Sequence, residues 1–394
     1  MSERSVVYGE AGALPARTQL AIIGGGVMGL SVAYQLTRRG FRDVVVLEAG
    51  YLAEGASGRN GGGVRMQWST EANIRLMQDS IELCRTFASD LGVHNWFRQG
   101  GYLFLARTPR MLAALEANSA LQNTCGVPTR LISPSEIRER VPDLVTDGIL
   151  GAAYNPKDGV VFPWPFLWGY AEQAMRGGAR LFLHTPVTAI EPVARGYSLT
   201  TSRGAIVADR VLCAAGAWSP EVARLVGLEL PNKPHRHEIL STEALRPFLD
   251  PMVAELESGL YFSQSMRGEI VCGISVPDAG DGKIRMGSRL DFLLRLAPAL
   301  LSVMPRLASV KVLRQWAGPY DVTPDGRPIL GEPEGLPGFH LLCGFVGHGF
   351  MMAPVMGRIY ADYFVDGVEH PIFADSRLSR FAHGELHKES MILG

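Results

Sequence analysis

Three glycines and one acidic residue near the N-terminus have the types and spacing of a phosphate-binding turn. Gly24, Gly26 and Gly29 follow a short apolar run, and Glu48 stands 19 residues after the last of them. The first glycine permits a tight turn, the second lets a pyrophosphate approach the backbone, and the third lets a helix pack closely on a sheet. An acid about 20 residues further on typically binds a ribose hydroxyl. The pattern predicts a dinucleotide site, with a purely structural glycine turn as the alternative.

The segments around these residues have the lengths that such a site requires. Residues 20–23 have the character of a buried parallel strand, residues 27–38 have a helical pattern, and residues 44–47 form a second apolar run that ends on Glu48. The start of the helix would present free N–H groups and the positive end of its dipole to a phosphate. The strand, glycine turn, helix and second strand therefore make a complete unit.

A second glycine-rich stretch follows and ends at Arg65. It contains five glycines between residues 55 and 63, with ordered segments on both sides. A plain glycine loop is the alternative, but a backbone path beside a bound cofactor explains the density better, because glycine permits close approach.

The rest of the chain alternates strand-like and helical segments, which indicates an α/β fold. Residues 197–201 and 205–207 predict a hairpin, and residues 211–215 predict a separate buried strand. Residues 232–273 are rich in β-type runs and predict an antiparallel sheet that belongs to a second, inserted domain. The predicted boundaries are 19–92, 151–228 and 321–380 for the first domain, 93–150 and 229–320 for the second, and 1–18 for an N-terminal arm.

Composition excludes several classes of function. The 394 residues are 47% hydrophobic and carry a net charge of −1, which gives no reason to expect nucleic acid as a partner. The 5 cysteines have no metal or disulfide spacing and are expected to be buried thiols of a cytoplasmic protein. No metal site, signal peptide or transmembrane segment is expected.

Four further motifs join the glycine turn. They are residues 57–63 (Ser-Gly-Arg-Asn-Gly-Gly-Gly), 215–218 (Ala-Gly-Ala-Trp), 323–329 (Thr-Pro-Asp-Gly-Arg-Pro-Ile) and 344–350 (Gly-Phe-Val-Gly-His-Gly-Phe). Together with the glycine turn they are similar to the FAD-dependent amine oxidoreductases of the D-amino-acid-oxidase type, over about residues 19–364. The branch that they resemble contains the β subunit of heteromeric sarcosine oxidase and the dye-linked proline and hydroxyproline dehydrogenases.

The resemblance implies a fold and a reaction. The fold would be α/β, with a Rossmann-like FAD-binding domain made of discontinuous segments and an inserted α+β substrate domain on a mostly antiparallel sheet. The reaction would be hydride transfer to flavin N5 from the carbon beside the amine of a secondary or cyclic amino acid, of the sarcosine, proline, hydroxyproline or opine class. A stand-alone oxidase that produces hydrogen peroxide, and a flavin-bound assembly factor without turnover, remain the alternatives.

The family's roles transfer to particular residues. Arg65 would bind a substrate carboxylate, with a surface salt bridge as the alternative. Tyr261 would lie on the substrate side unless it is an ordinary strand residue, and His348 would lie at the pyrimidine end of the flavin. His235 and His237 either face the active site or are plain sheet residues. The cofactor-binding residues implied are Gly24, Gly26, Gly29, Glu48, Ala49, Ser57, Gly58, Arg59, Asn60, Gly62, Gly63, Val187, Ala215, Gly216, Trp218, Gly318, Gly344, Gly347, His348, Gly349, Phe350 and Met351.

Departures from the family pattern refine these expectations. Gly318 stands where some relatives attach FAD through a Cys, so non-covalent FAD is expected, and no His near residues 160–166 could hold a covalent FMN. Met351 replaces a carboxylate-binding Lys, which disfavours sarcosine itself. Val271 replaces an oxygen-activating Lys, which favours a dehydrogenase over an oxidase. A second subunit that accepts the electrons, through FMN or an iron–sulfur centre, is therefore expected.

Overall fold

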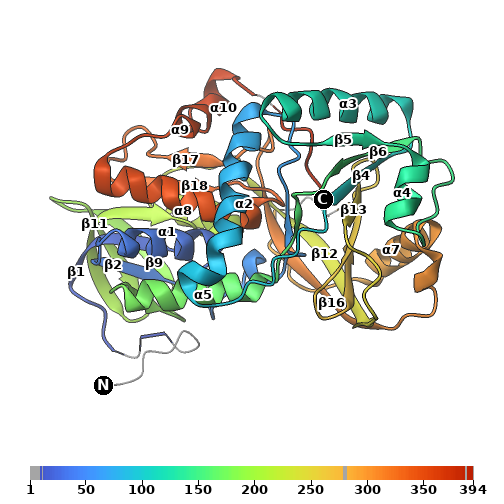
Figure 1. Ribbon diagram of the computed structural model, residues 1–394. Helices are drawn as coiled ribbons and strands as arrows, with labels where there is room; N and C mark the ends of the chain where they lie inside the picture. Colours follow the sequence, from blue (N-terminus) through green and yellow to red (C-terminus); the bar gives the residue numbers. More distant parts are fainter. Residues whose placement is uncertain (1–8, 11, 278–281, 387, 394) are drawn as a thin grey trace.

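The computed structural model describes residues 9–10, 12–277, 282–386 and 388–393, and it contains two large sheets that lie side by side (Figure 1). The first has eight strands in the order β17-β18-β11-β1-β2-β8, with β10 on β11 and β9 on β10. Its central strands are parallel, and their carboxyl-terminal halves are apolar, as expected for a sheet covered on both faces. The strands are β1 (Arg17–Ile23), β2 (Val44–Leu47), β8 (Arg180–Phe182), β9 (Val187–Pro192), β10 (Tyr197–Thr201), β11 (Gly204–Cys213), β17 (Ile329–Gly331) and β18 (Phe339–Cys343).

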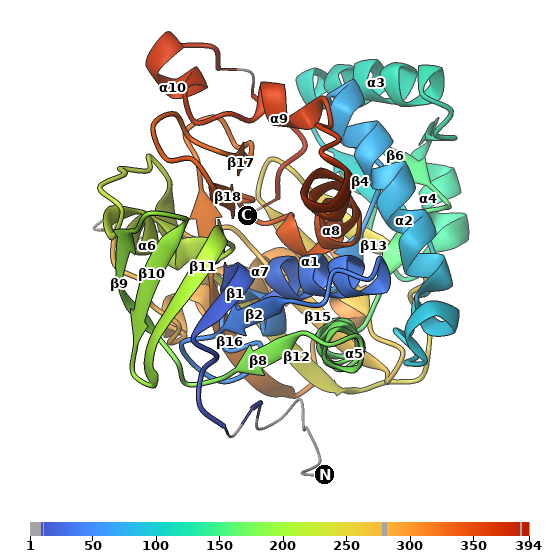
Figure 2. The ribbon, with the colours of Figure 1, turned by 90° about the vertical axis from the view of Figure 1, so that its left-hand side faces the viewer.

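One face of this sheet carries α1 (Val27–Arg38), which lies between α5 (Pro163–Arg176) and α8 (Gly349–Asp366) in Figure 2. Helix α2 (Glu71–Leu91) packs in turn on α8. Every residue of α1 from Val27 to Thr37 is buried. The helices approach closely because Gly357 of α8 faces α1, where an added Cβ would lie only 2.2 Å from Ser31 Oγ.

The second sheet has the strand order β16-β12-β15-β14-β13-β4-β6-β5 and is antiparallel except for the β13–β4 pair. Helices α3 (Pro109–Thr124) and α4 (Pro134–Arg140) pack on β6, and α7 (Leu290–Val303) packs on β14. The expected α/β fold with a second, mostly antiparallel sheet is confirmed. The strands are β4 (Tyr102–Ala106), β5 (Arg130–Ile132), β6 (Gly151–Asn155), β12 (Lys233–Ala244), β13 (Met252–Glu255), β14 (Leu260–Gln264), β15 (Glu269–Gly273) and β16 (Val312–Val322).

Strand β6 does not follow the predicted domain boundaries. It belongs to the second sheet, although the boundary predicted at residue 151 assigns it to the first domain. Among the described residues, no helix combines the length and the apolar character needed to cross a membrane. The remaining elements are β3 (Gly63–Val64) paired with β7 (Gly159–Val160), α6 (Ser219–Arg224), α9 (Ile372–Asp375), α10 (Arg380–His383) and three short 3₁₀ turns, η1 (Ala56–Gly58), η2 (Gly216–Trp218) and η3 (Pro305–Leu307).

Strand β11 corrects the prediction of two separate strands at residues 205–207 and 211–215. It is one strand of 10 residues that changes partners along its length. Its first half pairs antiparallel with β10, and its second half lies parallel to β1 and β18. The strand continues through the polar residues between the two halves, because Asp209 pairs with Arg17 and the Arg210 guanidinium lies over the ring of Phe364.

The motif at residues 323–327 is a turn that anchors the C-terminal helices. Asp325 accepts hydrogen bonds from Arg380 at 2.8 and 3.1 Å, and the two side chains are 0% and 3% exposed. Burial raises the pKa of Asp325, but the hydrogen bonds and charge of Arg380 outweigh burial and leave this pKa below its usual value. The turn therefore contains a buried ion pair that holds α10 against the first sheet.

We expect Arg380→Met to destabilise the protein by about 3–5 kcal/mol, because it leaves the Asp325 carboxylate buried without a cation. Urea unfolding would measure the loss. Arg377→Met is the matched control, since its ion pair with Glu369 is more than half exposed, and it should change stability by less than about 0.5 kcal/mol. Equal losses in the two variants would contradict a special role for the buried pair.

Candidate active site

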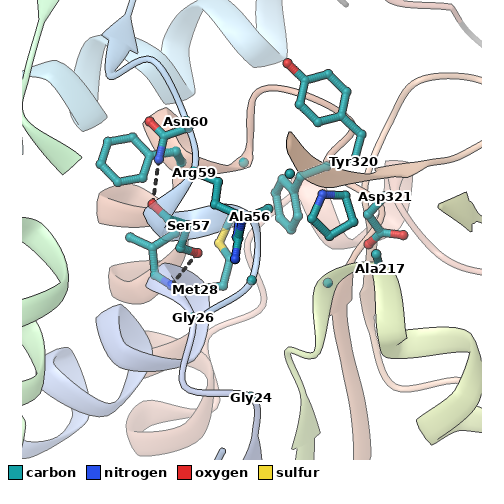
Figure 3. A pocket seen from close by; sticks show the side chains of 18 of the residues that line it. Gly24, Gly26, Met28, Ala56, Ser57, Arg59, Asn60, Ala217, Tyr320 and Asp321 are labelled. Atoms are coloured by element: carbon teal, nitrogen blue, oxygen red, sulfur yellow. Dashed lines mark hydrogen bonds between the residues drawn. The ribbon is translucent and has the colours of Figure 1, made fainter. Parts of the chain in front are cut away.

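A cavity of about 680 Å³ lies where the two sheets meet. It is lined by the ends of β1, β2 and β18, by the glycine-rich stretch before β3, and by side chains from the second sheet. Figure 3 shows Ser57, Arg59 and Asn60 on one side of the cavity, with Tyr320 and Asp321 on the other. The cavity thus joins the predicted phosphate-binding turn to the second sheet.

The first turn of α1 is open toward this cavity. Gly24 has a φ of +114°, and a Cβ there would lie 2.4 Å from the carbonyl oxygen of Ala214, so only glycine fits. A Cβ on Gly26 would meet only Ser57 Oγ, at 3.1 Å. Ser57 Oγ accepts a hydrogen bond from Val27 N at 3.0 Å, which fixes the glycine-rich stretch against the helix terminus. The arrangement offers backbone N–H groups and a positive helix end to an anion.

Glu48 lies at the end of β2, beside this turn. Its carboxylate accepts hydrogen bonds from Gly25 N at 2.7 Å and from Gly50 N at 2.8 Å. Burial raises the pKa of Glu48, and these backbone hydrogen bonds oppose the rise. The carboxylate is therefore held in place at the cavity wall and keeps acceptor capacity for a hydroxyl group.

The glycine-rich stretch is an ordered path. The Asn60 side chain donates to the Ser57 carbonyl at 2.6 Å and accepts from Gly62 N at 2.8 Å. Arg59 donates to the Glu54 carbonyl at 2.8 Å and to the Ala317 carbonyl, in the second sheet, at 3.2 Å. These contacts brace the path along the cavity.

Arg65 is buried at the end of this path, so the alternative of a surface ion pair is wrong. Its guanidinium donates to the carbonyl oxygens of Gln67 and Met391 and stacks on the Trp68 ring at 3.8 Å. Burial lowers the pKa of Arg65, and Nε has no hydrogen-bond partner among the described residues. A buried cation in the lining of a cavity favours an anionic group there.

Asp158 holds the part of the chain that follows Arg65. No sequence motif identified this residue. Its carboxylate accepts hydrogen bonds from Met66 N at 2.7 Å, Asn155 Nδ2 at 2.8 Å and Gln67 Nε2 at 3.0 Å. Burial raises the pKa of Asp158 to about 7, and the hydrogen bonds oppose this rise. The residue therefore fixes the chain directly after Arg65, although it does not line the cavity itself.

Aromatic side chains from three strands of the second sheet form the opposite wall. His237 Nε2 lies 3.0 Å from the Tyr261 hydroxyl, and the imidazole ring stacks between Tyr261 and Tyr320, with ring centroids 5.7 and 4.5 Å away. Burial lowers the pKa of His237 to about 3, so the ring is neutral near pH 7. Of the two alternating histidines, His237 lines the cavity and His235 does not.

His348 lies at the start of α8, between the two walls. It is 3% exposed, its ring meets the edge of Trp68 at 4.9 Å, and neither ring nitrogen has a hydrogen-bond partner in the described part of the chain. Burial lowers the pKa of His348 to about 3. Within the described ranges, no three His, Cys, Asp or Glu side chains gather as a metal site would need. His348 thus lines the cavity with buried ring nitrogens that lack a partner, as expected beside a site for an organic ligand.

Most of the predicted site residues line this one cavity. Gly29, Gly58 and Gly344 do not, and each instead permits close packing, since an added Cβ would lie 2.1 Å from the Gly24 carbonyl oxygen, 2.5 Å from that of Ala53 and 2.6 Å from the Thr323 methyl, respectively. The lining members are Gly24, Gly26, Glu48, Ala49, Ser57, Arg59, Asn60, Gly62, Gly63, Arg65, Val187, Ala215, Gly216, Trp218, Tyr261, Gly318, Gly347, His348, Gly349, Phe350 and Met351.

Sequence reasoning missed several wall residues, among them Tyr102, Met252 and Tyr320. The only available signal was strand alternation, because Tyr320 stands two residues after Gly318 on β16 and so shares its face. Tyr102 and Met252 carry no motif, and both lie against Gly63, where an added Cβ would approach them to 2.5 and 3.1 Å.

Known proteins share this architecture. A family model described as FAD dependent oxidoreductase matches residues 19–363. Sarcosine oxidase subunit beta of Rhizobium meliloti is 30% identical, over 93% of this chain and 89% of that protein. Mitochondrial dimethylglycine dehydrogenase of Rattus norvegicus is 29% identical over 89% of this chain, but the chain spans only 43% of that relative's length.

A solved structure agrees with these relatives. The crystal structure of L-proline dehydrogenase from P. horikoshii matches with a TM-score of 0.90 and 32% sequence identity, over 95% of this chain and all of that one. The resemblance inferred from the motifs is thereby confirmed, with FAD as the cofactor of the family. The chain belongs to the family of FAD dependent oxidoreductases.

Proposed function

We propose that this chain is the catalytic, β-type subunit of a dehydrogenase that oxidises the C–N bond of a secondary or cyclic amino acid. One observation carries the proposal: Arg65, a buried cation whose Nε lacks a hydrogen-bond partner among the described residues, lines the same cavity as a complete dinucleotide-binding turn. A cation at that place suits a substrate carboxylate, and the turn suits the cofactor.

The residues of the cavity fit FAD. The open first turn of α1 at Gly26 would hold the pyrophosphate, Glu48 the adenosine ribose, and His348 with its unpaired nitrogens the pyrimidine end of the flavin. Gly318 offers no nucleophile, so non-covalent binding is expected. When bound, FAD supplies the hydride acceptor, at N5 of its ring system.

The other wall suits the amine of the substrate. Arg65 would orient the carboxylate, while Tyr102, Tyr261 and Tyr320 supply aromatic surface for an alkylated or cyclic amine. His237 is neutral and shares a hydrogen bond with the Tyr261 hydroxyl, so this pair can accept a hydrogen bond from the amine without adding a competing cation. Proline fits this description, and a proline dehydrogenase is among the related structures.

The electron outlet is proposed to lie on a second subunit. Val271 stands near Gly61, where an added Cβ would lie 3.8 Å from it, and a valine cannot place a positive charge where superoxide forms. Relatives are named subunit beta of sarcosine oxidase, a name that itself implies further subunits. FMN or an iron–sulfur centre on such a partner would then receive the electrons.

We expect proline or a related secondary amino acid to bleach the visible flavin absorbance anaerobically. The reduced chain should then reoxidise quickly with an artificial dye and slowly in air-saturated buffer, as measured by stopped flow. Rapid reoxidation by air with stoichiometric peroxide would instead support a stand-alone oxidase. No bleaching by any secondary amino acid or opine would support an assembly factor without turnover.

A further inference from the structure

Residues 388–393 lie beside the substrate end of the cavity, although no motif singled them out. Leu393 lines the cavity, and the Met391 carbonyl accepts a hydrogen bond from the Arg65 guanidinium. Met391 is 1% exposed, and Ile392 packs on the turn at Gly326, where an added Cβ would lie 2.5 Å from Ile392 Cδ1. This anchor segment, as residues 388–393 are called below, is therefore part of the cavity wall.

Glu389 holds the anchor segment in place. Its carboxylate is buried and accepts hydrogen bonds from Ser69 N at 2.9 Å, Asn73 Nδ2 at 2.9 Å, Thr70 Oγ1 at 3.1 Å and Met391 N at 3.0 Å, as well as from the Ser69 hydroxyl. The donors from Ser69, Thr70 and Asn73 lie at the start of α2, where the helix dipole favours an anion. Burial raises the pKa of Glu389, but the hydrogen bonds outweigh it and leave this pKa below its usual value.

The anchor segment helps to hold the Arg65 guanidinium in one orientation. The carbonyls of Gln67 and Met391 each take one donor nitrogen of the guanidinium, and the Trp68 ring covers one of its faces. Nε is the nitrogen left without a partner among the described residues. A guanidinium binds a carboxylate through donors in a fixed plane, so two backbone acceptors that fix this plane also fix the direction of approach.

We propose that the anchor segment is a specificity element of the active site, in which Glu389 is a positioning residue for Arg65 and Leu393 limits the size of the substrate. The proposal rests on the proposed function, since Arg65 must meet a carboxylate. Glu389 itself acts only through Met391 and Arg65.

Glu389→Gln, and a chain that ends at Leu386, test the first part in the FAD-loaded protein. Both should raise KM for the amino-acid substrate by about tenfold or more and leave kcat within about twofold. The reason is that both changes weaken the contact between Arg65 and the substrate carboxylate, which is equally strong in the ground state and in the transition state. An amine that lacks the carboxylate should show no change. Glu385→Gln is the matched control, because Glu385 is exposed and near in the chain.

Leu393→Ala tests the second part and leaves the anchor intact. It should raise kcat/KM for substrates with a bulkier amine substituent relative to the smallest one by about tenfold, and should leave KM for the smallest one within about twofold. If the chain that ends at Leu386 fails to fold, Glu389→Asp, which shortens the reach to Ser69 and Asn73, replaces it with the same expected rise in KM.

A second readout separates this proposal from the proposed function. Binding of acetate, a simple monocarboxylate, can be measured from the change that it causes in the flavin spectrum. This measurement needs no turnover. Wild-type protein that binds acetate but is never reduced by an amine would refute the proposed function alone, and weaker acetate binding in Glu389→Gln would still support the anchor. Unchanged acetate affinity and KM in the Glu389 variants, or a lower KM, would overturn the anchor proposal.

Discussion

Gly26→Val is expected to yield a folded protein that no longer retains FAD. In the structure, a Cβ at this position meets only the Ser57 hydroxyl, at 3.1 Å, so a small shift of this one side chain would accommodate it and no backbone atom obstructs it. The valine would instead occupy the space in front of the first turn of α1, where a pyrophosphate needs the backbone N–H groups. Loss of two charge-assisted hydrogen bonds of about 1.5–3 kcal/mol each corresponds to FAD binding at least roughly 100-fold weaker.

The measurement is the flavin-to-protein ratio after purification, followed by FAD titration of the emptied protein, with circular dichroism as the check on folding. Gly287→Val is the control, because no atom lies within 4 Å of a Cβ there. Gly29→Val should unfold the protein, since its Cβ would lie 2.1 Å from the Gly24 carbonyl oxygen. A Gly26→Val protein with full flavin content would refute this turn as the pyrophosphate site.

Arg65→Lys is expected to lower kcat/KM for an amino-acid substrate by about 10- to 150-fold while FAD content holds. Lysine keeps the charge but loses the planar fork, so one charged hydrogen bond of roughly 1.5–3 kcal/mol is removed. Arg65 also donates hydrogen bonds to the carbonyl oxygens of Gln67 and Met391. A fall in activity alone would therefore not distinguish substrate binding from maintenance of the local structure.

A comparison of two substrates resolves this ambiguity. Wild-type protein should strongly prefer the amino acid over the same amine without its carboxylate, and Arg65→Lys should lose most of that preference. Steady-state kinetics with both compounds give the four values of kcat/KM needed. An equal loss for both substrates would mean that Arg65 only maintains the shape of the cavity.

Local patterns in the sequence predicted the local structure well. Helix α1 has the predicted bounds, because an unbroken apolar face begins after the glycine turn and ends near Gly40. Helix α4 begins with a capping box, in which Ser133 and Glu136 satisfy one another's backbone N–H groups, as the Ser-x-x-Glu spacing favours. Both features depend on residues only a few positions apart, so a linear pattern contains them.

The walls of the cavity depend on residues that are far apart in the chain. His237 meets Tyr261 only because β12, β15 and β14 pair in one register, in which Ile239 and Tyr261 both stand opposite Gly273. Arg65 meets Met391 across 326 residues. Neither contact follows from the hydrophobic periodicity of the sequence. A shift of one residue in the pairing of a strand would turn every side chain of that strand to the other face of the sheet. Motifs therefore identified the cofactor end better than the substrate end.

The packing of α1 against α8 also has a consequence for biosynthesis. About 310 residues separate the end of α1 from the start of α8, and both helices bury nearly all of the face that they share. At roughly 5–20 residues per second on the ribosome, α1 would wait about 15–60 s for its partner. During that time its apolar residues would be open to chaperones and to aggregation. The cofactor site, which needs residues on both sides of this gap, would close only after α8 has emerged, so FAD is expected to load after translation of α8.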